Sequence, residues 1–575
     1  MGLYTELPAE LDSVDIIVAG GGTAGCIVAS RLADADPGLS ILVIEAGPDG
    51  IGNPAVDYPA FFLNNVIPGT TTAAFYKGHK SNYTGNRDII VPTGSVLGGG
   101  SAVNMMMYSR AQRSDWDSWQ TPGWSADEIL PFLKKLETCH GPGSLDSHGS
   151  DGPIHVSAGT FCATRPQSDF ISVMNKVGWP EVDDLGNLDS CNGVQRAVRF
   201  ISPNGKRQDT ASRYLRPCLQ DGLHPNLHVI VKSQVVQILI ENGKATGVIY
   251  RPEDAPERTV KARKMVILSC GAFGTPAVLE RSGVGDPEVL GRAGVSVVAN
   301  VPSVGHEYED HHLIVYPYKS SLAPEETMDG ILTGALNAEE LIKANHPILG
   351  WNAQDVTCKL RPSDEDIASL GPTFQEVWNK EFRDNLNRPL MMMSLASVFL
   401  ETPLGFLPGR PNPTDPLDFE TRFFSDEKGI DLLKHRWAYK KQREVARRMN
   451  VFRGELASHH PPFPGGSKAV CITTNEPLAD VQDIEYSAED DAIIDSWTRA
   501  NVGSAWHSLG TCKIGPVAQY GVVDQNLSVH GVKNLKLADL SILPKTVAAN
   551  TNNTALVIGE KAADIIIKEL SLDQS

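Results

Sequence analysis

The stretch SAWHSLGTC, residues 504–512, places a single histidine, His507, beside Trp506 among small residues. An imidazole titrates near neutral pH, so His507 could accept and return a proton during a reaction. A metal site is disfavoured, because Cys512 is five residues away and no His-x-x-x-His or Cys-x-x-Cys motif accompanies it. A buried structural histidine is the competing interpretation. This stretch alone makes His507 a candidate for proton transfer.

A glycine motif near the N-terminus, Gly20-x-Gly22-x-x-Gly25, is typical of dinucleotide binding. The glycines permit a tight turn and close approach to a pyrophosphate, and the helix that follows offers free backbone N–H groups. An acid, Glu45, follows Gly25 by twenty residues, where a carboxylate can bind ribose hydroxyls. We therefore expect the following residues to contact a dinucleotide: Gly20, Gly22, Thr23, Ala24, Gly25 and Glu45.

This motif requires a strand, a turn, a helix and a second strand in succession. Residues 14–19 form a short apolar run rich in β-branched side chains, which is typical of a buried parallel strand. Residues 26–33 are small and apolar and are expected to form the helix, and residues 40–44 are expected to form the second strand. Further strands are expected at 227–240, 245–250 and 265–269, and the last segment, 535–567, returns to strand, loop and helix.

The middle of the chain differs from both ends. Residues 311–499 are richer in proline, aromatic residues and irregular spacing. A chain of 575 residues is also too long for one core. The sequence therefore predicts a discontinuous dinucleotide-binding domain that carries an inserted second domain. The expected boundaries are 1–155, 205–310 and 500–575 for the first domain, and 156–204 and 311–499 for the second.

Composition excludes several classes of partner. A net charge of −18 disfavours binding to nucleic acid or to anionic lipid. The nine cysteines are scattered without a Cys-x-x-Cys pair, which indicates reduced thiols rather than a disulfide framework or a zinc site. The acidic N-terminus lacks the features of a signal peptide, no apolar run is long enough for a membrane span, and the C-terminus LSLDQS is neither SKL nor KDEL. A cytoplasmic location is expected, with export by a route without a cleavable signal left open.

Three further stretches carry a family resemblance. They are the glycine-rich TGSVLGGGSAVN at 93–104, GAFGTPAVLERSGVG at 271–285 and GHEYEDH at 305–311. With the first glycine motif, they resemble the glucose–methanol–choline (GMC) family of flavin oxidoreductases, from Gly20 to Glu560 and at the family's spacings. Two positions depart from the pattern: Ser95 stands where a basic residue or asparagine is usual, and Glu307 replaces an asparagine.

The resemblance implies the fold class and the cofactor. The fold class is α/β: a discontinuous Rossmann-like FAD-binding domain with an inserted α+β substrate-binding domain built on an antiparallel sheet. The cofactor is FAD. Val103 stands where some relatives attach FAD covalently through a histidine, so non-covalent binding is expected. No metal is expected. Besides the first glycine motif and Glu45, the implied FAD contacts are Gly98, Gly99, Ser101, Asn104, the backbone of Val235, Asp539 and Thr551.

The resemblance also gives His507 a partner. In this family a catalytic histidine is followed some forty positions later by a histidine or an asparagine, and here Asn550 follows His507 by 43 residues. His507 would accept the hydroxyl proton of an alcohol while a hydride passes to flavin N5, and Asn550 would donate its amide N–H to the developing alkoxide. Trp506 is expected to form a wall beside the flavin that fixes the imidazole. The adjacent pairs His311–His312 and His459–His460 are expected to be structural.

The implied reaction is oxidation of a primary alcohol to the aldehyde, with O₂ as acceptor and H₂O₂ as product. The segments 104–110 and 505–512 resemble the alcohol oxidase branch of the family. An aryl or phenylpropanoid alcohol and a quinone-dependent dehydrogenase are alternatives, and a hydroxynitrile lyase on the same fold is an alternative of another class. A formate-oxidising relative would carry arginine in place of Asn550. The expected partners are a small alcohol and O₂, without nucleic acid or membrane, and a homo-oligomer is left open.

Overall fold

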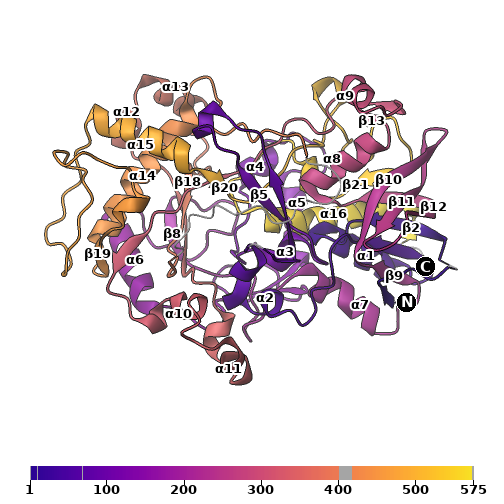
Figure 1. The fold of residues 1–575 in the computed structure, drawn as a ribbon, viewed down its shortest axis with the longest axis horizontal. Helices are drawn as coiled ribbons and strands as arrows, with labels where there is room; N and C mark the ends of the chain where they lie inside the picture. The colour runs from indigo at the N-terminus through magenta and orange to yellow at the C-terminus, as the bar shows by residue number, and fades with distance from the viewer. Residues whose placement is uncertain (1, 10, 68, 400–416, 573–575) are drawn as a thin grey trace.

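A mixed sheet of eight strands lies at one end of the computed structural model, which describes residues 2–9, 11–67, 69–399 and 417–572 (Figure 1). Its long strand β12 (Arg258–Leu268) pairs in parallel with β2 (Ser13–Ala19) and β21 (Leu535–Leu537), and antiparallel with β11 (Lys244–Pro252). Beyond β2, each further strand pairs in parallel with its neighbour, and beyond β11 the last strand pairs antiparallel. The remaining strands are β3 (Ile41–Ile44), β9 (Leu227–Ile230) and β1 (Gly2–Tyr4) on the β2 side, and β10 (Ser233–Glu241) beside β11.

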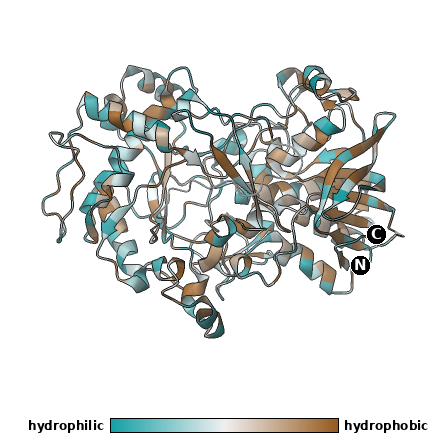
Figure 2. Cartoon of the chain, viewed as in Figure 1, coloured by the Kyte–Doolittle hydropathy of each residue, from teal (hydrophilic) through white to brown (hydrophobic). Residues whose placement is uncertain are grey.

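The first βαβ unit forms because its strands are apolar and its helix is small-sided. Every residue of β3 is buried, and the strands of the sheet are largely hydrophobic in Figure 2. Helix α1 (Thr23–Ala35) packs closely against α16 (Asn552–Leu570), since a Cβ on Gly559 would lie only 3.1 Å from the Ala24 Cα atom. The first and last segments of the chain therefore pack against each other. The strand expected at 227–240 is instead two strands, β9 and β10, because the chain turns at Lys232, which has a positive φ of 54°.

A second group of elements lies at the other end of the molecule (Figure 1). Its three-stranded antiparallel sheet contains β8 (Gly193–Arg196), β17 (Val356–Leu360) and β18 (Met391–Met393). A two-stranded sheet and four helices surround it: β16 (Tyr318–Ser320), β19 (Phe452–Glu455), α6 (Thr164–Lys176), α13 (Pro372–Glu381), α14 (Ile430–Arg448) and α15 (Ala488–Asn501).

This second region has a hydrophobic core of its own. Phe170 and Val194 from the earlier part of the chain pack with Val356, Trp437 and Phe452 from the later part. Both expected segments of the substrate-binding domain therefore contribute to one core. The α/β fold class is confirmed, and the exact domain boundaries stay a prediction that this separate core supports.

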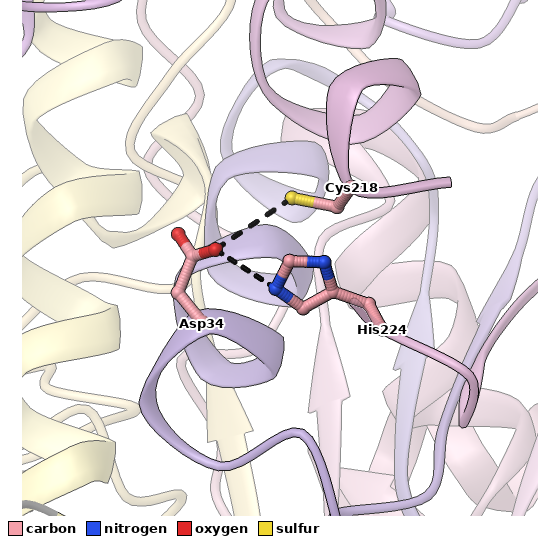
Figure 3. Close-up of side chains that lie close together, drawn as sticks. All are labelled: Asp34, Cys218 and His224. Atoms are coloured by element: carbon pink, nitrogen blue, oxygen red, sulfur yellow. Dashed lines mark hydrogen bonds and ion pairs between the residues drawn. The ribbon is translucent and has the colours of Figure 1, made fainter. Parts of the chain in front are cut away.

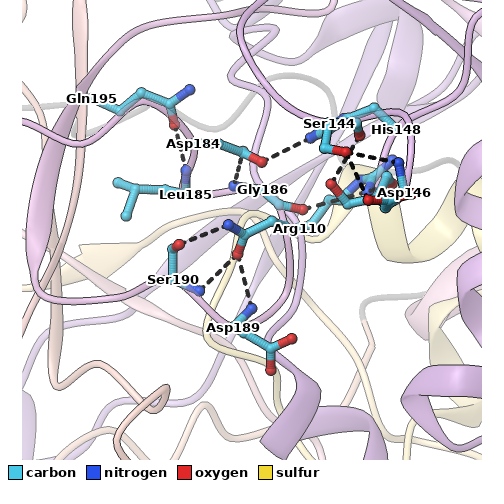
Figure 4. A network of polar contacts seen from close by, with 12 residues as sticks. Arg110, Ser144, Asp146, His148, Asp184, Leu185, Gly186, Asp189, Ser190 and Gln195 are labelled. Atoms are coloured by element: carbon cyan, nitrogen blue, oxygen red, sulfur yellow. Dashed lines mark hydrogen bonds and ion pairs between the residues drawn. The ribbon is translucent and has the colours of Figure 1, made fainter.

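A buried charged network fixes the chain just after the second glycine-rich loop (Figure 4). The Arg110 guanidinium donates to Glu137 Oε1 at 2.6 Å, and the ring of His148 lies between Glu137 (2.8 Å) and Asp184 (3.1 Å). Breaking a buried pair of this kind leaves an uncompensated charge, which destabilises strongly. The network therefore holds the Arg110 segment rigidly. Within the described residues, no helix has both the length and the apolar character of a membrane span.

Candidate active site

Two glycine-rich loops meet at the start of helix α1. The backbone N–H of Gly98 donates to the Gly21 carbonyl at 2.8 Å, and the backbone N–H of Ser101 donates to Thr23 Oγ1 at 3.1 Å. A Cβ on Gly99 would lie 2.8 Å from the Gly22 Cα atom, so only glycine permits this contact. The two loops thus form one wall of a large cavity.

The glycines of the first motif have different tasks. A Cβ on Gly25 would lie 2.1 Å from the Gly20 carbonyl oxygen, so Gly25 is required for the helix to pack on the turn. A Cβ on Gly22 would lie no closer than 3.6 Å to another protein atom. Gly22 instead faces the cavity, where a side chain would take space from a ligand. Helix α1 also begins without a side-chain cap or an acidic residue in its first turn. Its free N–H groups and the open space at Gly22 fit the pyrophosphate of a dinucleotide.

Glu45 immediately follows strand β3 and lines the same cavity. Its carboxylate accepts the backbone N–H of Gly21 and of Gly47, each at 2.8 Å. Burial raises the pKa of Glu45 to about 7, although these amides oppose the shift. Each carboxylate oxygen keeps a lone pair for a further donor, so the position fits a ribose hydroxyl.

The remaining predicted FAD contacts lie at the cavity or directly behind its wall. Asn104, Val235, Trp506, Asp539 and Thr551 line the cavity, together with Gly20, Gly22, Thr23, Ala24, Glu45 and Gly99. Gly25, Gly98 and Ser101 lie behind the lining, and Ser101 Oγ bonds the Gly98 carbonyl at 2.6 Å. The Asp539 carboxylate accepts Gly271 N, Thr275 Oγ1 and Ser541 N at 2.6 to 2.9 Å. Oδ2 accepts two of these donors and Oδ1 accepts one, so the protein itself fixes the Asp539 side chain at the cavity wall.

The turn that carries His507 is held by Asp310. Strand β15 (His312–Leu313) pairs antiparallel with β20 (Gly503–Ser504), which brings Asp310 beside the turn. Asp310 accepts the His507 backbone N–H at 2.9 Å and the Ser504 hydroxyl, which itself accepts the Trp506 N–H at 2.8 Å. Trp506 adopts a φ of 63°, a conformation that bulky residues rarely take. Such strain persists only where surrounding bonds enforce it, as they do here.

His507 lies between His311 and Asn550. The two Nδ1 atoms of His507 and His311 are 2.8 Å apart, and His311 Nε2 is 2.9 Å from Thr546 Oγ1. On its other side, His507 Nε2 lies 3.4 Å from Asn550 Nδ2. His311 was expected to be structural, and its contact with His507 was missed because two-residue strands leave no pattern in the sequence. Its neighbour His312 points to His435 instead, with 3.2 Å between the ring nitrogens.

The hydrogen-bond partners assign one tautomer to His507. If His311 donates from Nε2 to Thr546, its Nδ1 is an acceptor and His507 must carry its hydrogen on Nδ1. His507 Nε2 then has a free lone pair, which agrees with an approaching Asn550 amide N–H. The opposite tautomer would place a hydrogen on His507 Nε2, where it would face the hydrogens on Asn550 Nδ2. The geometry therefore favours Nε2 as the basic atom.

The surroundings keep these imidazoles neutral. Burial lowers the pKa of His507 well below its usual value of 6.5, and the His311 ring lowers it further. Burial lowers the pKa of His311 to about 4 and raises that of Asp310 to about 6. A neutral His507 can accept a proton at pH 7.

His507 and Asn550 line the same cavity as the glycine loops. The cavity has a volume of about 2840 Å³, several times that of a usual ligand pocket of about 300–1000 Å³. It extends from the turn before α1 to the second region of the molecule, where His312, His435 and the methionines of β18 line it. This space accommodates a dinucleotide together with a second ligand.

Comparisons with known proteins show the family of this chain and its fold. Residues 14–313 and 407–559 match the two family models described as GMC oxidoreductase. An alcohol oxidase of Candida boidinii is 33% identical and one of Pichia angusta is 35% identical, each over 98% of this chain and 96% of that protein. The crystal structure of a formate oxidase superposes with a TM-score of 0.81 at 20% identity, over 98% of this chain and 99% of that one. This last likeness shows the fold alone.

Proposed function

This chain belongs to the GMC oxidoreductase family, whose members are flavoproteins, and on that premise we propose that it oxidises a primary alcohol to the aldehyde with O₂ as acceptor. The observation that carries this proposal is the position of His507 Nε2, a neutral base beside the Asn550 amide at the end of the cavity that begins at the glycine loops. The resemblance to alcohol oxidases at 33–35% identity supports the same reaction.

The cofactor would be FAD, held without a covalent bond. Gly20, Gly22, the α1 N-terminus and Glu45 would hold its ADP portion, and Gly99, Asn104 and Thr551 would lie nearer the flavin. Val103, rather than a histidine, stands immediately before Asn104, which agrees with non-covalent binding. When bound, FAD supplies the acceptor for the hydride that leaves the alcohol carbon and then passes the electrons to O₂, giving H₂O₂.

The protein residues would handle the proton and the charge. His507 Nε2 accepts the hydroxyl proton, and the chain through His311 to Thr546 keeps His507 Nδ1 protonated, so that Nε2 stays the basic atom. Asn550 has a second amide N–H, which can donate to the alkoxide oxygen as negative charge develops there. The positive charge then left on the imidazole can stabilise superoxide during reoxidation.

The proposal leaves the size of the alcohol to experiment. The relatives are named alcohol oxidases without a substrate size, and the large cavity and the methionines Met391, Met392 and Met393 can accommodate an aryl or phenylpropanoid alcohol as well as an aliphatic one. A quinone in place of O₂ would require no change in the residues described above.

The test is anaerobic mixing of the purified flavoprotein with alcohols from methanol to cinnamyl alcohol. Loss of the visible flavin band is the expected result, and the reduction rates rank the substrates. Air is then admitted, and rapid return of the band with one H₂O₂ per turnover identifies an oxidase. A slow return that a quinone accelerates would identify a dehydrogenase. A flavin that no alcohol reduces would refute alcohol oxidation, and release of cyanide from mandelonitrile by that protein would identify a lyase.

A further inference from the structure

A cysteine, a histidine and a carboxylate converge on the outer side of the dinucleotide-binding region, away from the cavity (Figure 3). Asp34 lies in the last turn of α1, Cys218 in α7 (Arg216–Gln220), and His224 in the loop between α7 and β9. Asp34 is eleven residues from Thr23, so the cluster is about 16 Å along the helix from the dinucleotide turn. None of the three residues has a role in the proposed oxidation.

Two separations in this cluster are close to those between the ligands of a tetrahedral metal ion, and its three ligand atoms all lie within 4.8 Å of one another. His224 Nε2 lies 3.1 Å and Cys218 Sγ lies 3.8 Å from the same oxygen, Asp34 Oδ1. For zinc, with bonds of about 2.0 Å to nitrogen or oxygen and 2.3 Å to sulfur, tetrahedral angles give separations of about 3.3 Å and 3.5 Å. Each observed separation differs from the ideal one by a few tenths of an ångström. A small rotation of the exposed Asp34 side chain would correct this difference.

The partners of the histidine agree with a metal site. The other ring nitrogen of His224, Nδ1, lies 3.1 Å from the Asp221 carboxylate. A histidine that binds a metal usually donates its second N–H to such a carboxylate, which fixes the tautomer and orients the ring. His224 and Cys218 are each 6% exposed, whereas the side chain of Asp34 is 44% exposed. Two ligands are therefore held by the protein, and the open side at Asp34 leaves room for water as the fourth ligand.

Local charge also favours a divalent ion. A Cys218 thiolate, Asp34 and Asp221 would supply three negative charges, and the Arg31 guanidinium, 3.6 Å from Asp34 Oδ2, shares its positive charge with Glu560, 3.3 Å from Arg31 Nε. A divalent cation would bring this group close to neutrality. Sulfur, imidazole and carboxylate together are the donor set that zinc prefers.

The other His–Cys–Glu cluster in the described part of the chain lacks these properties. Arg110 donates directly to Glu137 Oε1, the same oxygen that His148 Nδ1 contacts and that a metal would need. A cation there would compete with a buried guanidinium. That cluster is complete as an ion-pair network. At Asp34, by contrast, Arg31 contacts Oδ2, and Oδ1 is left to His224 and Cys218.

We propose that Asp34, Cys218 and His224 form a zinc-binding site that joins the end of α1 to the α7–β9 connection. This proposal departs from the sequence-based expectation of no metal, because ligands from distant segments give no motif. It is also independent of the proposed alcohol oxidation.

The test measures zinc bound to the full-length flavoprotein, purified without a histidine tag and equilibrated with Zn²⁺ before free metal is removed. We expect about one tightly bound zinc per chain. Cys218→Ser, His224→Gln and Asp34→Asn should abolish tight binding, and Asp221→Asn should weaken it about 10- to 100-fold. Cys191→Ser, which changes a cysteine outside both clusters, is the matched control and should bind like the unmodified protein.

Cobalt distinguishes thiolate ligation from adventitious binding. With Co²⁺, the unmodified protein and Cys191→Ser should show a thiolate-to-cobalt charge-transfer band, which Cys218→Ser should lack. Asp34→Asn alters an exposed side chain, so its flavin content should be unchanged and its loss of zinc is decisive even if Cys218→Ser does not fold. Absence of zinc from the unmodified protein, or equal zinc in Asp34→Asn and the unmodified protein, would overturn the proposal.

Discussion

Replacement of His507 by alanine is the most direct test of the proposed mechanism. The variant should keep its fold and its flavin, because the backbone N–H that bonds Asp310 is retained and the imidazole lines an open cavity. It should lose the atom that accepts the alcohol proton. Flavin reduction under anaerobic conditions should therefore slow, whereas substrate binding should change little.

The expected loss can be bounded from the structure. A positioned general base contributes about 10²- to 10⁴-fold, equivalent to roughly 3–5 kcal/mol of the barrier. Behind the deleted ring, His311 Nδ1 would lie roughly 5 Å from the former position of Nε2, a distance that one water molecule can bridge. This substitute base should keep the loss near the lower limit. A second change, His311→Phe, should remove it and move the loss toward the upper limit.

The assay is stopped-flow flavin reduction across pH. In the unmodified protein, the rate should stay constant at neutral pH and fall only well below 6.5, because His507 must be neutral and its pKa is lowered. In His507→Ala the remaining acid limb should be that of His311, whose pKa burial lowers to about 4, and it should disappear when His311→Phe is added. Added imidazole should restore part of the rate. His140→Gln, at an exposed histidine that pairs with His155, is the matched control and should behave like the unmodified protein. Reduction by His507→Ala at the normal rate would refute this assignment.

Three further predictions concern Asn550 and the cofactor site. Asn550→Ala should slow flavin reduction roughly 10- to 100-fold, as expected for loss of a hydrogen bond of about 1.5–3 kcal/mol to a charged group, measured in the same assay. Gly22→Ala should fold but lack flavin, whereas Gly25→Ala should lower the melting temperature as well, because only the second Cβ collides with the backbone; absorption spectra and thermal melts distinguish them. The folded-state pKa of Glu45 is raised to about 7, so its contribution to stability is complete below pH 4.5 and is lost as pH rises. The flavin-free protein should therefore lose about 3 kcal/mol relative to Glu45→Gln between pH 4.5 and 7, measured by denaturant unfolding.

The sequence predicts the strand, turn, helix and strand that carry the first glycine motif because the constraints on this unit are local. The turn before α1 needs glycine for reasons that a few neighbouring atoms decide, and Glu45 follows at the end of the next strand. Apolar runs of strand length then give β2 and β3 directly.

The sequence does not predict contacts between distant segments. The approach of His311 to His507 depends on the pairing of β15 with β20, which are two residues each and carry no periodicity. The same limit applies to Asp34, which meets Cys218 only after α1 and α7 pack. Which glycine-loop residues face the cavity, such as Gly99, and which lie behind it, such as Ser101, also depends on the packed structure.

The contact between the two ends of the chain sets an order for biosynthesis. Helix α1 leaves the ribosome early, but its partner helix α16 leaves it last, as does strand β21, which pairs with β12, after the entire second region. The ribosome adds about 5–20 residues per second, and domains generally fold as units during this synthesis. The second region can therefore acquire its core while the region of the large sheet still lacks a strand and a helix. Stable retention of FAD should begin only once translation has finished, so a truncated product would be released without its flavin.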